Sequence, residues 1–165
     1  MSRHRIVHQL SKSALDGLRE TAIPKKRFFG APRDSFHDYL RKHGAKVAEY
    51  PWSGYVLATL LPYLQEQHQI DLMRSEQDAL SKYLSENRSV TVFIFTSHHR
   101  TAYADKLGAE FSEQALRDYY NRLNGSSEPD VGKPMLDGIR AIRQSLNALD
   151  EFSHHYHHWI IGPAF

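Results

Sequence analysis

A stretch near the middle of the chain has the alternating pattern of a buried β-strand. Between Ser89 and Phe95, successive side chains would point to opposite faces, and both faces are apolar or nearly so. A strand with two apolar faces is typically covered on both sides, so the pattern predicts a central strand. The apolar run stops at residues 96–100, which read TSHHR. Polar groups would therefore lie at the carboxyl end of the strand, where α/β sheets usually bind ligands.

Other stretches carry apolar residues at the three- and four-residue spacing of amphipathic helices. The strongest begins after Ser53, and Pro62 inside it is expected to kink the helix or divide it near Leu61. Another begins at about Pro134, and these two helices should provide most of the apolar cover of the sheet. Shorter helices are predicted at four places where a polar residue suits the N-cap: Ser11 or Ser13, Asp34 or Ser35, Ser75 and Ser112.

Three further stretches are weaker strand candidates. They are residues 5–10, residues 45–50 and the segment around Trp159, Ile160 and Ile161. Helices alternating with strands predict an α/β fold with a small mixed β-sheet of about three to five strands and helices on both faces. We expect one domain spanning residues 1–165, in which Ser126 to Gly132 forms an exposed, mobile loop.

Length and composition are those of a globular protein. The 165 residues are 41% hydrophobic and 24% charged, with a formal net charge of +2. That charge does not by itself indicate a nucleic-acid or membrane partner. The absence of cysteine excludes disulfides, thiolate metal ligands and cysteine nucleophiles. With no apolar core of a signal peptide and no run long enough to span a membrane, we expect a cytoplasmic protein and no membrane partner.

Histidine is the unusual feature of the composition, with 11 residues. Two clusters stand out: His98 and His99 after the predicted central strand, and four histidines bracketing Tyr156. On a strand, His155 and His157 would share a face and could bind one metal ion, zinc or another transition metal, with His98 or His99 as a third ligand. The alternative is that the second cluster provides polar positions on an edge strand.

Aromatic and arginine residues on the predicted helix after Ser112, together with Tyr103 before it, could form a surface for another protein. Tyr and Arg are enriched at the energetic centres of protein interfaces. The candidate partner-binding residues are Tyr103, Arg117, Tyr120 and Arg122. The alternative is that one of the neighbouring tyrosines packs in the core.

The densest basic run is Lys25, Lys26 and Arg27, followed directly by Phe28 and Phe29. Cations beside aromatic rings suit single-stranded nucleic acid. The alternative is a solvated loop whose two phenylalanines dock on the core.

These patterns lead to three functional hypotheses. The first is a non-catalytic protein-binding domain, such as a small cytosolic neutraliser or regulator of a partner protein. It is favoured because no Walker loop, dinucleotide turn, nucleophile elbow or H-E-x-x-H motif occurs. The second is a metal-dependent hydrolase that uses the histidine clusters. The third is a nucleic-acid binder that uses the basic and aromatic loop. The sequence predicts neither the oligomeric state nor the identity of a partner.

Overall fold

The structure is a computed structural model that describes residues 5–26, 28–30, 33–149 and 156–161. For Arg5 and for residues 156–161, the description covers the backbone alone. Its elements follow in the order β1 (Arg5–Leu10), α1 (Lys12–Glu20), α2 (Phe36–His43), β2 (Ala45–Tyr50), α3 (Gly54–His68), α4 (Asp78–Arg88), β3 (Thr91–Phe95), α5 (Ser97–Tyr103), the 3-10 helix η1 (Lys106–Gly108), α6 (Glu113–Asn124), α7 (Gly132–Asn147) and β4 (Tyr156–Ile161).

The four described strands form one sheet in the order β2-β1-β4-β3. The α/β fold and its small sheet are confirmed, but the described pairings are all antiparallel rather than mixed. The prediction that β3 is central is wrong, because β3 lies at one edge of this order. Its apolar pattern arises because helices cover both faces, and such cover does not depend on how many strands flank it.

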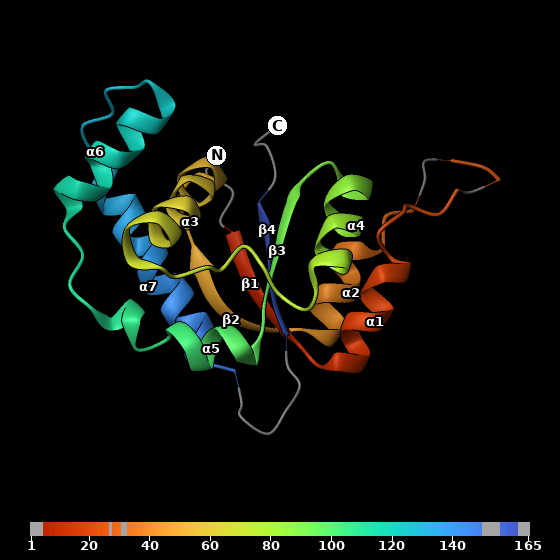
Figure 1. The fold of residues 1–165 in the computed structure, drawn as a ribbon. Coiled ribbons are helices and arrows are strands. Elements are labelled where there is room, and N and C mark those ends of the chain that lie inside the picture. Colours follow the sequence, from red (N-terminus) through yellow and green to blue (C-terminus); the bar gives the residue numbers. More distant parts are fainter. Residues whose placement is uncertain (1–4, 27, 31–32, 150–155, 162–165) are drawn as a thin grey trace.

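Helices cover both faces of the sheet (Figure 1), and they pack on it through two separate hydrophobic clusters. On one face, α3 and α7 supply half of the buried side chains of the cluster, and Phe95 of β3 joins them. On the other face, α1, α2 and α4 pack against Val92 and Ile94 of the same strand. Strand β3 thus contributes to both clusters from its position at the edge.

Serine side chains begin several of these helices, as the sequence predicts. The Ser53 hydroxyl accepts a hydrogen bond from the Tyr55 N–H at 3.2 Å, and Ser112 accepts one from the Ala115 N–H at 3.3 Å. Helix α3 continues through Pro62 to His68, so the predicted division near Leu61 does not occur. Within the described part of the chain, no helix has both the length and the apolar character needed to cross a membrane.

Candidate functional site

The first candidate site is the end of the sheet where β3 stops, close to the predicted metal-binding histidines His98 and His99. The register pairs Phe95 with His157, and α5 begins two residues later, with His98 and His99 in its first turn. The backbone therefore brings His157 to the same end of the sheet as His98 and His99. His155 and the side chain of His157 lie outside the described residues.

The ring of His99 is fully engaged in structural hydrogen bonds. Its Nδ1 accepts the Thr96 N–H at 3.1 Å, and its Nε2 donates to the Arg74 carbonyl at 2.6 Å. Burial lowers the pKa of His99, which outweighs the opposing effect of the Arg74 carbonyl. The ring is thus neutral and caps α5, and a metal ion could bind it only by displacing one of these partners. His98 is exposed, and the described residues contain no group of three metal-ligating side chains.

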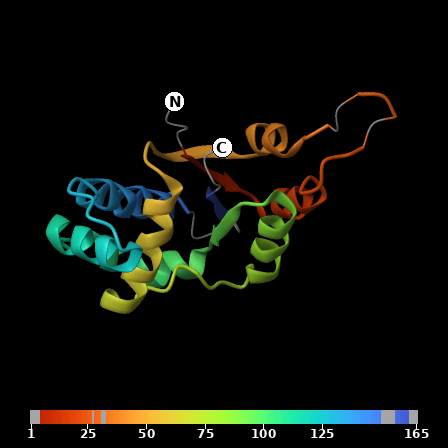
Figure 2. The ribbon, with the colours of Figure 1, turned by 90° about the horizontal axis from the view of Figure 1, so that it is seen from above.

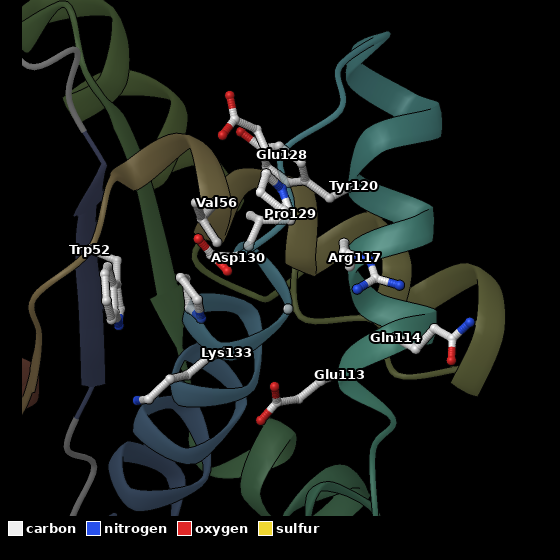
Figure 3. Close-up of a pocket in the computed structure, with 13 residues that line it drawn as sticks. Trp52, Val56, Glu113, Gln114, Arg117, Tyr120, Glu128, Pro129, Asp130 and Lys133 are labelled. Atoms are coloured by element: carbon white, nitrogen blue, oxygen red, sulfur yellow. The ribbon is translucent and has the colours of Figure 1, made fainter.

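A pocket of about 600 Å³ lies where α3, α6 and α7 meet (Figure 3). Trp52, Val56, Tyr120 and Pro129 contribute its apolar and aromatic lining. The charged lining comprises three carboxylates and two cations: Glu113, Glu128, Asp130, Arg117 and Lys133. An apolar pocket of this size with a few charged groups at its margin is typical of a binding site.

One wall of the pocket is held together by the carboxylate of Asp137. It accepts the Trp52 indole N–H at 3.1 Å and pairs with Lys133 Nζ at 2.9 Å. Arg140 pairs with its second oxygen at 3.1 Å. Burial opposes ionisation, but the hydrogen bonds from Lys133 and Trp52 and the two cationic charges lower the pKa of Asp137 below its ordinary value. An ionised Asp137 therefore fixes the Trp52 ring, and the Lys133 ammonium lies 5.8 Å from that ring's centroid.

The opposite wall consists of α6 and the loop that follows it. Figure 3 shows Tyr120 beside Glu128 and Pro129, across the pocket from Trp52. The side chain of Asn121 fastens the loop, because its Oδ1 accepts the Glu128 N–H at 2.8 Å and its Nδ2 donates to the Glu128 carbonyl at 3.1 Å. The loop predicted at residues 126–132 is exposed along most of its length, but it is tied to α6 at Ser126 and Glu128.

The start of α7 packs directly against the start of α6. A Cβ added at Gly132 would collide with the backbone carbonyl of Glu113, so only glycine permits this approach. The two helices are therefore held in a fixed position at the base of the pocket, where Glu113 and Gly132 both line it.

Of the four predicted partner-binding residues, Arg117 and Tyr120 line the pocket. Tyr103 does not; its ring stacks on His99 with a centroid separation of 6.3 Å. Arg122 lies over the ring of Tyr119, 5.3 Å from its centroid. Sequence reasoning missed Trp52, Lys133 and Asp137, because nothing in their spacing indicates that residues about eighty positions apart share a wall.

The basic run lies in the connection between α1 and α2. Lys25 and Lys26 are exposed, as is expected of a binding loop, and Arg27 lies outside the described residues. The alternative in which both phenylalanines dock on the core is wrong, because Phe28 is 99% and Phe29 is 87% exposed.

The described arrangement can therefore hold a ligand between a fixed indole, a half-buried tyrosine and a margin of mixed charge. Comparison with known proteins found no match to this chain among protein families, curated proteins or solved structures.

Proposed function

We propose that this protein is a non-catalytic protein-binding domain whose site is the pocket between α3, α6 and α7. The observation that carries the proposal is the lining of that pocket, where Trp52, Tyr120 and Arg117 come together from two sides. These are the residue types that most often dominate the binding energy of protein interfaces.

The surroundings of the pocket support a protein segment as the ligand. Tyr55 is 68% exposed on α3, directly before the lining residue Val56, and Leu123 is 55% exposed on α6, one turn after Tyr120. Asn124 ties the two helices together through a hydrogen bond to Thr59 at 3.3 Å. Exposed apolar side chains on the helices that form the pocket extend the apolar contact surface beyond it.

The charged residues of the pocket lining indicate which kind of partner segment would bind there. Glu128 and Asp130 lie on the exposed loop at the margin, and Glu113 lies at the start of α6. Lys133 is paired with Asp137, which neutralises part of the cationic lining. A partner segment with a basic residue next to an apolar or aromatic one is therefore complementary to the pocket.

The test uses a random peptide library displayed on phage and selected against the full chain. Selected peptides are expected to share a basic residue beside an apolar one, and to shift the backbone resonances of the pocket residues. The variant Glu128→Lys with Asp130→Lys should weaken their binding by about tenfold or more, because it reverses two charges at the margin. Glu86→Lys on α4 is the control and should leave binding unchanged.

Two results would overturn the proposal. One is the recovery of peptides that bind the doubly reversed variant as tightly as the wild type. The other is a set of resonance shifts confined to residues away from the pocket.

A further inference from the structure

The connection between α1 and α2 projects from the protein (Figure 2), and we call its described residues (24–26, 28–30 and 33) the finger. Lys25 and Arg33 exchange two backbone hydrogen bonds, at 3.1 and 3.0 Å, in an isolated antiparallel bridge. Its described residues extend away from the body of the protein, past α1 and α2 (Figure 2). The bridge closes the base of the finger, and the described residues 28–30 between its two members form the tip.

The tip carries two adjacent aromatic side chains in solvent. Phe28 and Phe29 are 99% and 87% exposed, and their rings meet edge to face with centroids 5.7 Å apart. Large apolar side chains that gather on a protruding segment, with so little contact to the body, commonly mark an interaction site.

Cations surround the base of this apolar tip. Lys25, Lys26 and Arg33 are all exposed, and the sequence places Arg27 directly before Phe28. The nearest acidic residue in the chain, Asp34, is bound by both terminal nitrogens of Arg88, at 2.9 and 2.7 Å. The finger therefore presents apolar rings at its end with positive charge behind them.

We propose that the finger inserts Phe28 and Phe29 into the surface of an anionic lipid bilayer while its cationic stem binds lipid phosphate groups. A protruding tip can reach the flat surface of a bilayer. From the tip of the finger to its base, apolar rings are followed by cations, which matches the acyl region of a bilayer followed by its anionic headgroups. A single nucleic-acid strand instead needs a basic groove and ring faces open for stacking. The finger projects from the body of the protein (Figure 2), and its two rings meet edge to face.

This proposal departs from the sequence-based expectation of no membrane partner, which was based on the absence of a membrane-spanning run and on the small net charge. Helices α3, α6 and α7, which contribute to the lining of the pocket, lie on the other side of the sheet from the finger (Figure 1). The observations that support lipid binding by the finger are separate from those that support peptide binding at the pocket. A negative result for one proposal therefore leaves the other standing.

The experiment measures flotation of the full chain with vesicles of phosphatidylcholine and phosphatidylserine, and with vesicles of phosphatidylcholine alone. The wild type is expected to float with the mixed vesicles only, and added salt should weaken the association. Phe28→Ala with Phe29→Ala, and separately Lys25→Glu with Lys26→Glu, should each reduce binding by about tenfold or more. Leu123→Ala and the pair Lys82→Glu with Lys106→Glu are matched controls outside the finger and should bind as the wild type does.

Insertion is checked by a separate variant, Phe28→Trp. Its added tryptophan emission should shift to the blue with the mixed vesicles and should be quenched by brominated lipid. Absence of wild-type binding to the mixed vesicles overturns the proposal, as does vesicle binding without the blue shift. Binding to a poly(U) oligonucleotide in place of vesicles also overturns it, in favour of nucleic acid.

Discussion

The indole Nε1 of Trp52 donates a hydrogen bond of 3.1 Å to Oδ2 of Asp137, a residue 85 positions further along the chain. The same carboxylate pairs with Lys133 and Arg140. A tryptophan at the margin of a pocket is useful for binding only if its ring is held in place before the ligand arrives, because ordering it at that moment costs affinity. Asp137 provides that order.

Replacement of Asp137 by alanine should therefore loosen Trp52 and leave the fold intact. The expected loss of stability is about 1 kcal/mol, because the lost hydrogen bonds and ion pairs are partly exposed. Peptides selected on the wild type should bind about tenfold more weakly, the factor that corresponds to about 1.4 kcal/mol. The solvent-exchange rate of the Trp52 indole proton, followed by NMR, should rise. Asp16→Ala on the exposed face of α1 serves as control, and an unchanged indole exchange rate in Asp137→Ala would contradict this role.

Acidification should destabilise the protein through His99. Burial lowers the pKa of this ring below 6.5, as it also does for His8 and His37. The unfolded chain then binds the proton more readily than the folded one. The stabilising contribution is therefore complete above about pH 6.5 and is lost as the pH falls through the folded-state pKa.

The variant His99→Gln isolates this contribution, because glutamine does not titrate. At neutral pH it should be less stable than the wild type by about 1–3 kcal/mol, since the ring's two buried hydrogen bonds are disturbed. Its free energy of unfolding should also depend less on pH below 6.5. Urea titrations at several pH values measure both effects, with His98→Gln on the exposed side of α5 as control. Equal pH dependence in wild type and His99→Gln would show that another group is responsible.

Removal of the Asn121 side chain should release the loop that forms one wall of the pocket. In the wild type, Asn121 Oδ1 accepts from both the Ser126 hydroxyl and the Glu128 N–H. In Asn121→Ala, hydrogen exchange at the Glu128 amide should be about fivefold faster, for a hydrogen bond worth roughly 1 kcal/mol. Asn87→Ala, which removes a comparable bond within α4, should leave that amide unchanged. Slow exchange in both variants would mean that other contacts hold the loop.

A serine on α4 closes the outer edge of β3. The Ser85 hydroxyl accepts the Val92 N–H at 2.9 Å and donates to the Ser81 carbonyl at 2.7 Å. Ser85→Ala should cost about 1–3 kcal/mol, because it leaves a part-buried N–H without this acceptor. It should also increase concentration-dependent association, since an edge strand with free backbone groups pairs with other chains. Denaturation and light scattering test both effects, and Ser81→Ala should be close to wild type.

The sequence predicts whether a segment is a helix or a strand better than it predicts where that segment lies in the fold. Ser53 and Ser112 are correctly identified as starts of helices, since capping is a local interaction within a few residues. The place of β3 in the sheet is not local. Its two apolar faces report helices above and below it, and the Ser85 contact that covers its edge gives no periodic signal.

The difference between local and long-range information also explains which residues of the candidate site could be predicted from the sequence. Arg117 and Tyr120 were predicted because tyrosine and arginine are common at interfaces, and both line the pocket. Tyr103 and Arg122 were predicted for the same reason, but Tyr103 stacks on His99 in α5 and Arg122 lies over the ring of Tyr119. The exposure of Phe29 could not be predicted, because an apolar residue in a loop has the same local sequence whether it packs on the core or points into solvent. Burial of such a side chain depends on the rest of the fold.

The position of β4 has a consequence for how the protein is made. This strand pairs with β1 on one side and β3 on the other, although it follows both in the chain. During translation, β1 and β3 emerge from the ribosome with a gap between them that only the later segment can fill. The nascent chain must therefore keep two strand edges apart until synthesis reaches residue 161, and a chaperone that shields such edges would shorten its exposure to misassembly.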